Sequence, residues 1–220
     1  MKKLLFYKTV FICLTTFAVA LFAANAVEEK LDFVLKNMRS AESEISDLEI
    51  DYREEILYLA DSSRQTIEGN LKFLKPGKFF ISQKTPQEQK IYINSNAVTV
   101  YTPSNKQALI DNWSNQTNSE FTPASAVNFA HSWRDMSKTH SLTFIKEDKG
   151  VYILALSPNN KIWTMSIYIS KENFRPSRMI VKSNSYTIDI SLFNYKINQN
   201  TNKKIFDFSP PKGVEVIKLN

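Results

Sequence analysis

The stretch Gly69-Asn-Leu-Lys-Phe-Leu-Lys-Pro-Gly-Lys-Phe-Phe-Ile81 carries apolar residues at alternating positions, separated by turn residues, and shows no helical period. Two further short apolar runs follow it, Lys90-Ile-Tyr-Ile93 and Ala97-Val-Thr-Val-Tyr101. Proline interrupts regular strand pairing. Pro86, after Thr85, therefore separates these two runs from the first stretch, and Pro103 ends the second run. This pattern predicts a series of short antiparallel strands.

Strand parity groups the large side chains of this stretch. Alternate residues of a strand point to the same side, so Leu71 and Phe73 share one face with Lys75. After the turn that follows Lys75, Phe79 and Ile81 share a face again. The sequence therefore predicts a wall of large apolar side chains with one cation among them.

The first 26 residues have the form of a secretory signal peptide. A basic start is followed by an apolar run over residues 9–24, and Ala24-Asn25-Ala26 is a small-x-small cleavage site. An uncleaved membrane anchor is the alternative, because the apolar run is nearly long enough to span a bilayer. Cleavage after Ala26 is favoured, since no basic cluster follows. We expect residues 27–220 to form a single exported domain.

The cysteine count and the charge limit the possible functions further. Cys13 is the only cysteine, and it lies inside the apolar run rather than after a lipidation box. The mature chain should therefore contain no thiol, lipid anchor or disulfide, and its stability must come from its core. The formal charge of +6 includes three lysines of the signal segment, which leaves +3 without them. No long basic run indicates nucleic-acid binding.

The remainder of the chain predicts two helices and many strands. Apolar residues spaced by three and four predict an amphipathic helix from Val27 to about Arg39. Thr122 as N-cap and Pro123 at the first helical position predict a second helix through Trp133, either a lid over an open sheet or an ordinary connection. Further strands are expected at residues 47–59, 65–67, 107–111, 142–145, 151–156, 162–169, 177–181 and 186–193. Regular short strands indicate one antiparallel sheet, strongly curved or barrel-like.

The usual signatures of catalysis are missing from the sequence. The chain has two histidines, His131 and His140, and four glycines, with no Gly-rich phosphate loop, Cys/His metal spacing or Gly-x-Ser-x-Gly elbow. We therefore expect no enzyme, no cofactor and no metal site. The abundant aromatic residues on strands could fill a closed barrel, or they could line a cavity for acyl chains if the sheet stays open. The residues alone leave both interpretations open.

Three segments resemble the LolA-type periplasmic carriers of outer-membrane lipoproteins. They are Gly69-x-Leu-x-x-x-Lys-Pro-x-x-Phe79, residues 89–103 with Gln89-Lys-Ile-Tyr-Ile-Asn-Ser95, and Phe206-Asp-Phe-Ser-Pro-Pro-Lys-Gly-Val-Glu-Val-Ile217. The resemblance implies a mainly β fold with an unclosed antiparallel half-barrel, covered by short helices that form a lid. It also implies a periplasmic, monomeric chaperone. This chaperone would take the acyl chains of lipoproteins from an inner-membrane lipoprotein-releasing ABC transporter to an outer-membrane acceptor.

The resemblance also indicates which side chains would contact lipid. These candidate residues form an apolar set contributed by the sheet and by the inserted helix: Leu71, Phe73, Phe79, Ile81, Ile91, Val127, Phe129 and Trp133. Strand parity places Leu71 and Phe73 on the same face as Lys75. Only the resemblance indicates that this face is the concave one.

Lys75 occupies a position where the family has arginine. In the family, that arginine is thought to bond lid carbonyls and to close the empty cavity. Lysine keeps the charge but lacks the planar fork that bonds two acceptors at once, so the resemblance implies a looser lid latch at Lys75. The alternative is an ammonium group that simply lies in water at a strand end.

Two other functions fit a similar fold. A periplasmic lipid- or lipoprotein-sensing module in envelope-stress regulation is the main alternative, and such a sensor would need a second domain for which a chain ending at Asn220 has no room. The outer-membrane acceptor of similar fold is itself a lipoprotein, and the lack of a lipidation box near Cys13 argues against it.

Overall fold

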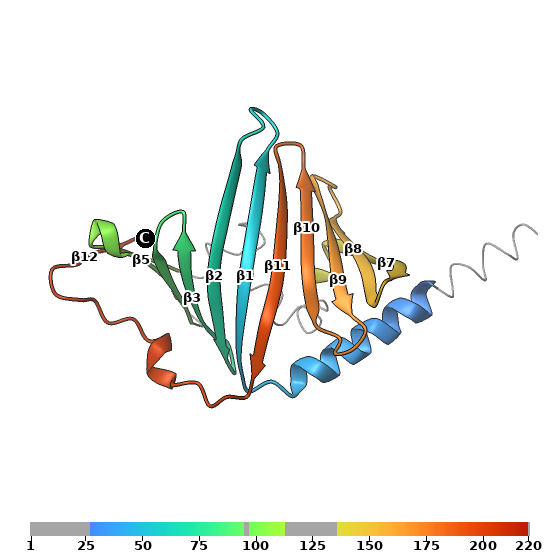
Figure 1. The fold of residues 1–220 in the computed structure, drawn as a ribbon, viewed down its shortest axis with the longest axis horizontal. Helices are drawn as coiled ribbons and strands as arrows, with labels where there is room; N and C mark the ends of the chain where they lie inside the picture. The colour runs from blue at the N-terminus through green and yellow to red at the C-terminus, as the bar shows by residue number, and fades with distance from the viewer. Residues whose placement is uncertain (1–26, 95–96, 113–135, 220) are drawn as a thin grey trace, which may run out of the picture.

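A computed structural model describes residues 27–94, 97–112 and 136–219 (Figure 1). The predicted signal segment, residues 1–26, lies outside this part of the chain, and so does the predicted inserted helix with its candidate residues Val127, Phe129 and Trp133. In the described residues the fold is a single curved sheet with one α-helix and two short 3-10 segments, η1 (Pro103–Asn105) and η3 (Lys203–Phe206).

Twelve strands form the sheet of the described residues, in the order β12-β6-β5-β4-β3-β2-β1-β11-β10-β9-β8-β7. Neighbours pair antiparallel except β12 and β6, which run parallel. Figure 1 shows β12 and β7 at opposite ends of this open sheet. The predicted strands are confirmed, and their bounds are β1 (Asp47–Tyr58), β2 (Arg64–Leu74), β3 (Lys78–Thr85), β4 (Gln89–Ile93), β5 (Ala97–Thr102), β6 (Gln107–Asn112), β7 (His140–Asp148), β8 (Val151–Pro158), β9 (Trp163–Ser170), β10 (Pro176–Ser183) and β11 (Tyr186–Ile197). The strand β12 (Glu215–Lys218) and its parallel pairing were not predicted from the sequence.

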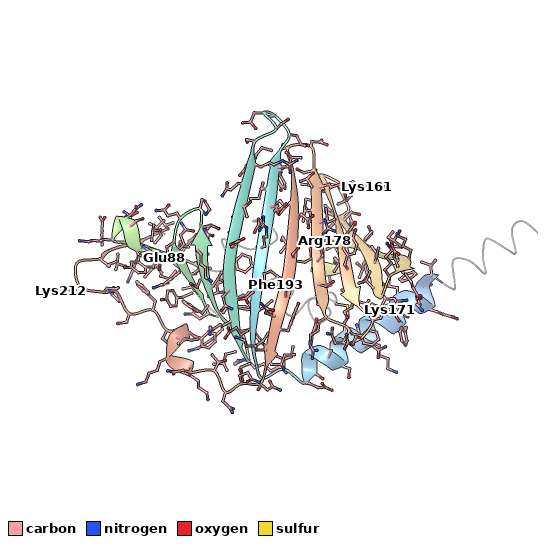
Figure 2. The ribbon with its side chains drawn as sticks, in the orientation of Figure 1. Glu88, Lys161, Lys171, Arg178, Phe193 and Lys212 are labelled. Carbon is pink, nitrogen blue, oxygen red and sulfur yellow. The ribbon has the colours of Figure 1, made fainter. Side chains whose placement is uncertain are left out.

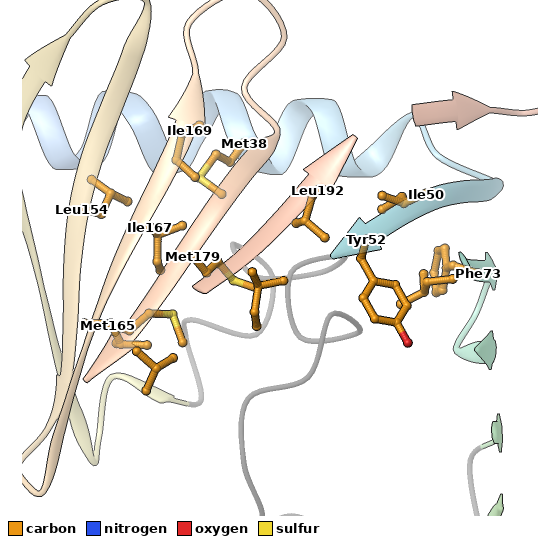
Figure 3. Close-up of a cluster of buried hydrophobic side chains, with 14 of the residues drawn as sticks. Met38, Ile50, Tyr52, Phe73, Leu154, Met165, Ile167, Ile169, Met179 and Leu192 are labelled. Carbon is orange, nitrogen blue, oxygen red and sulfur yellow. The ribbon is translucent and has the colours of Figure 1, made fainter. Parts of the chain in front are cut away.

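The N-terminal helix spans residues 27–43, one turn longer than the sequence predicted. The mostly polar segment after Arg39 includes Ala41 and Glu42, which are good helix formers, so the polarity of a segment does not by itself end a helix. Its stripe of Val34, Leu35 and Met38 is buried and joins the core of the sheet, as Figure 3 shows for Met38. Within the described residues, no helix is long and apolar enough to cross a membrane.

The sheet has one apolar face, which we call the inner face. On β1, Leu48, Ile50 and Tyr52 are buried in the core, whereas the intervening Glu49 and Asp51 lie on the opposite, outer face. This period of two follows from the strand pleat. Because the helix packs on the same core, the inner face is the side of the sheet that the helix covers.

The pairing of β1 with β2 brings the Tyr52 ring over Gly69. Tyr52 and Gly69 are cross-strand partners, and Tyr52 is 3% exposed. A Cβ atom at Gly69 would lie 2.6 Å from the Tyr52 hydroxyl oxygen and 2.6 Å from the Ser82 carbonyl oxygen. Glycine is therefore required here for the close approach of three neighbouring strands.

We predict that Gly69→Ala lowers the free energy of unfolding by about 1–3 kcal/mol, because the added methyl overpacks a site closed by backbone. Gly77→Ala is the matched control, since a Cβ atom there meets nothing within 4 Å. Urea unfolding of both variants measures the difference. Equal unfolding midpoints for the two variants would contradict this, because they would show that the Tyr52 ring and β3 can move aside for the methyl group with no loss of stability.

The corner between the helix and β1 is fastened to the turn after β11. The Asn198 Oδ1 accepts hydrogen bonds from the backbone N–H and from the hydroxyl of Ser46, both at 2.8 Å. Its Nδ2 donates to the Glu44 carbonyl at 2.9 Å. Asn198 has a φ of 55°, a left-handed conformation that asparagine adopts more readily than most residues. One side chain thus fixes both segments.

Asp47 provides a second fastening at the same corner. Its carboxylate is 4% exposed and accepts hydrogen bonds from the backbone N–H groups of Gln199 and Asn200 and from the Thr201 hydroxyl. Burial is the largest single influence on the pKa of Asp47 and opposes ionisation. The hydrogen bonds from Thr201, Gln199 and Asn200 together outweigh it and lower the pKa below the ordinary 3.8.

We predict that Asp47→Asn destabilises the fold by about 1–3 kcal/mol at pH 7, because an amide NH₂ replaces one acceptor that faces N–H donors. The folded pKa of Asp47 is lowered, so its contribution is present above pH 3.8 and is lost as the pH falls through the folded pKa. Urea unfolding from pH 7 to pH 3 should therefore show the gap between wild type and variant closing in acid. A gap that is independent of pH would contradict this assignment.

The C-terminal segment crosses the outer face of the sheet. Phe206 of η3 is 1% exposed, and Lys78 pairs with Asp207 at 2.7 Å. The Phe208 ring lies 5.3 Å from the Tyr92 ring and 5.8 Å from the Tyr101 ring, centroid to centroid. Because these aromatic residues pack on the outer face, they are separate from the inner-face candidates.

Candidate functional site

All five candidate residues of the sheet lie on the inner face, in two cross-strand rows. Leu71 of β2 pairs with Ile81 of β3, and Ile81 pairs with Ile91 of β4. Phe73 of β2 pairs with Phe79 of β3, and their ring centroids are 5.0 Å apart. Since Leu71 and Phe73 are opposite Ile50 and Leu48 of β1, the predicted shared face is the face of the core.

Neighbouring strands extend both rows. We call them the apolar rows; they are Leu48-Phe73-Phe79-Ile93-Val98 and Ile50-Leu71-Ile81-Ile91-Val100-Leu109-Ile217. Every member of both rows is apolar. The sheet thus presents a continuous hydrocarbon surface from β1 to β5, and the second row continues it to β12.

Burial separates the candidate residues into two groups. Leu71, Phe73 and Ile81 are 1%, 1% and 4% exposed, so they belong to the core. Phe79 and Ile91 are only half-buried. The half-buried pair therefore offers the surface that a ligand can reach, while the buried group supports it from below.

The other half of the sheet continues the apolar inner face under the helix. Its central row consists of four buried side chains: Ile190, Met179, Ile167 and Leu154. Figure 3 labels Met179, Ile167 and Leu154 together with the helix. Figure 3 also places Met38 of the helix beside this half. The helix thus covers β8 to β10, and the rows on β2 to β6 carry the half-buried residues.

The outer face has the opposite chemistry. Glu49 is paired with Lys72 at 2.7 Å and with Lys196 at 3.0 Å, and the hydrogen bond from Lys72 is the main cause that lowers the pKa of Glu49. Arg178, labelled on β10 in Figure 2, forms a two-point ion pair with Asp189. On these central strands the outer face is lined by ion pairs, and the outer-face aromatic residues of β4 and β5 pack against Phe208 of the C-terminal segment, so the inner face is the candidate site.

Lys75 fastens the sheet to the end of the N-terminal helix. Its Nζ donates a hydrogen bond to the Ser43 carbonyl at 2.7 Å, and its backbone N–H donates to the Ser46 carbonyl at 2.9 Å. Ser43 ends the helix, where unpaired carbonyls and the helix dipole favour a cation. Lys75 thus bonds a backbone carbonyl of the N-terminal helix. Its predicted role as a latch for the inserted helix stays a prediction, because that helix lies outside the described residues.

Polar inner-face residues were missing from the sequence prediction. Gln83 and Gln89 are cross-strand partners, and Gln83 also pairs with Gly69, so both belong to the face of Tyr52. Burial raises the pKa of Tyr52, and the nearby Glu54 carboxylate raises it further, so Tyr52 stays a neutral phenol. The alternation of side chains along β3 and β4 could have predicted their positions, because Gln83 and Gln89 lie two residues from the candidates Ile81 and Ile91.

No metal-binding chemistry is visible in this part of the structure. Over residues 27–94, 97–112 and 136–219, no group of three or more His, Cys, Asp or Glu side chains is placed to hold an ion.

Comparison of the sequence with known proteins identifies relatives of this chain. The family model described as "Outer membrane lipoprotein carrier protein LolA" matches residues 43–209. The chain belongs to the LolA family. An outer-membrane lipoprotein carrier protein of Pseudomonas putida (strain W619) is 26% identical over 206 residues, 90% of this chain and 91% of that protein. A protein of the same name from Coxiella burnetii is 24% identical over 202 residues, 89% of each chain.

Among solved structures, an uncharacterized conserved protein from Thermus thermophilus has the same fold. It is 16% identical, with a TM-score of 0.54 over 87% of this chain and 98% of that one. The match to the LolA family confirms the resemblance found in the sequence, and the unclosed sheet with its covering helix confirms the predicted fold class. The helical lid is confirmed only for the helix of residues 27–43.

For this LolA family member we predict that Lys75→Met lowers the free energy of unfolding by about 0.5–1 kcal/mol, because the Ser43 carbonyl loses its exposed charged donor. Lys75→Arg should keep the stability of wild type, since arginine can donate to the same carbonyl. Lys212→Met, at an exposed position of the C-terminal segment, is the control. Thermal unfolding measures all three, and equal losses for the Met variants would exclude a role for the Lys75 contact.

Proposed function

We propose that this protein is a periplasmic carrier that binds the acyl chains of lipoproteins released from the inner membrane and delivers them to an outer-membrane acceptor. The observation that supports it is the inner face, where two apolar rows run across the strands from β1 and carry half-buried residues such as Phe79 and Ile91. Membership in the LolA family supports the same function.

The energetics of the cargo agree with a carrier. Each methylene removed from water contributes about 0.8 kcal/mol, so a lipid anchor with two or three acyl chains requires a large apolar surface in transit. The inner face supplies that surface without any reaction. Delivery then requires only that the acceptor binds the cargo more tightly than the carrier does.

The proposal includes partners and a location. The donor would be an inner-membrane lipoprotein-releasing ABC transporter, and the recipient would be an outer-membrane lipoprotein acceptor. Residues 1–26 would direct export and be removed, leaving a monomeric carrier of residues 27–220 in the periplasm. Val127, Phe129 and Trp133 would complete the lipid-binding surface from the inserted helix, as the sequence predicts.

We predict that Ile91→Glu abolishes release of lipoproteins from inner-membrane vesicles that contain the transporter. A carboxylate at this half-buried inner-face position places a charge where the acyl chains would lie, which is strongly unfavourable. Ser82→Glu is the matched control, because Ser82 lies on the outer face opposite Lys90 and receives the same new charge. Circular dichroism establishes that both variants are folded.

The two variants separate the proposed function from its alternatives. Release by Ser82→Glu and none by Ile91→Glu is the expected result. Normal release by a folded Ile91→Glu variant would exclude the inner face as the cargo site. Lipid binding by the wild-type protein with no release of lipoprotein would instead indicate a lipid-sensing module of the same fold.

A further inference from the structure

A row of polar side chains borders the apolar rows on one half of the inner face. Gly69 of β2 pairs with Gln83 of β3, and Gln83 pairs with Gln89 of β4. In the neighbouring pair of strands, Thr102 of β5 is opposite Gln107 of β6. We call Gln83, Gln89, Thr102 and Gln107 the polar row. All four side chains are half-buried.

The polar row follows the apolar rows directly along each strand. On β3 the inner-face residues are Phe79, Ile81 and then Gln83, and on β4 Ile91 is followed on the same side by Gln89. Gln83 is four positions after Phe79, which is about 13 Å along a strand. A hydrocarbon chain lying along β3 would therefore meet apolar side chains over this length and an amide at its end.

The polar row is not simply the edge of the inner face toward water. On the other half of the sheet, Leu192 lies at the level of Tyr52 and Gly69 and is 5% exposed. The next two inner-face residues of the same strand, Ile190 and Ile188, are also buried. At this level the inner face is thus apolar on β11 and polar on β3 to β6, where the half-buried candidate residues lie.

The amide groups of the row have hydrogen-bonding capacity for a ligand. Gln83 Nε2 donates to the Gln87 carbonyl at 3.1 Å, and Gln107 Nε2 donates to Glu215 at 3.2 Å, so each uses one of its two N–H donors there. Within the described part of the chain, the Gln89 side chain forms no hydrogen bond. On the inner face Gln89 lies between Gln83 and Gln107, and both N–H donors of its amide can bond a ligand.

We propose that the polar row binds the ester and amide carbonyl groups of a lipidated N-terminal cysteine, while the apolar rows hold its acyl chains. This inference rests on the proposed carrier function. The chains of such an anchor join glycerol and cysteine through carbonyls, which accept hydrogen bonds and are costly to bury unpaired. Glutamine N–H groups at the end of an apolar surface therefore fix the depth and direction of the bound anchor.

The test compares two lipopeptides that differ only in these carbonyls. One is a dipalmitoylglyceryl-cysteinyl peptide, and the other is its dialkyl ether analogue with chains of the same length. Wild-type protein should bind the ester form about 3- to 10-fold more tightly, the range of one hydrogen bond. Gln89→Leu should remove this preference and leave the affinity for the ether form unchanged. Gln199→Leu, in an exposed turn, is the control that should keep it.

The outcomes separate this inference from the carrier function itself. Binding of neither lipopeptide by the wild-type protein would exclude the proposed function. Equal affinity for both lipopeptides, or an ester preference that persists in Gln89→Leu and in Gln83→Leu, would overturn the polar row while leaving the carrier function in place. Dipalmitoyl phosphatidylglycerol measured alongside distinguishes anchor from phospholipid, because tighter binding of the phospholipid than of the ester lipopeptide would overturn the assignment to a lipidated cysteine.

Discussion

The register between β1, β2 and β3 is the constraint on which the other features of this sheet depend. A shift of one residue would turn Leu71 and Phe73 to the outer face and the polar Asn70 and Lys72 into the core. Two contacts oppose such a shift. The Tyr52 ring fits only over a residue without a side chain, which is Gly69, and the outer face pairs Glu49 with Lys72. Packing on one face and ion pairing on the other therefore favour the same alignment.

The same alignment determines where the helix lies. At its C-terminal end, Lys75 and Asn198 bond the carbonyls of residues 43 and 44, so the end of β2 and the turn after β11 both hold this corner. Toward its N-terminal end, Lys30 pairs with Glu147, which also accepts a hydrogen bond from Lys171. These polar contacts are exposed at both ends, and between them the buried apolar stripe of Val34, Leu35 and Met38 joins the helix to the sheet. The buried stripe therefore contributes most of the attachment, because exposed hydrogen bonds and ion pairs contribute little each.

A carrier must bind an apolar cargo strongly enough for transport and weakly enough for delivery. In the proposed carrier, the inner face would combine two means of doing so. Its apolar rows would bind hydrocarbon in proportion to the area covered, without regard to the identity of the lipid. The polar row would add directional hydrogen-bond donors at one level of the surface, and these donors would favour lipids whose carbonyls they can pair. Affinity and selectivity would then come from adjacent rows of the same strands.

The sequence by itself determined the strands from β1 to β11 and the grouping of the candidate residues, but not β12 or the pairing of β1 with β11. Alternation from Gly69 to Ile81 was sufficient to place Leu71 and Phe73 on one face, because the pleat of a strand has a period of two whatever its neighbours are. The tertiary structure decided what local pattern cannot contain. It determined that Leu71 is core while Ile91 is half-buried, and that the Lys75 ammonium meets the end of the first helix. It also aligned Gln83 with Gln89, since cross-strand register and burial depend on segments distant in the chain.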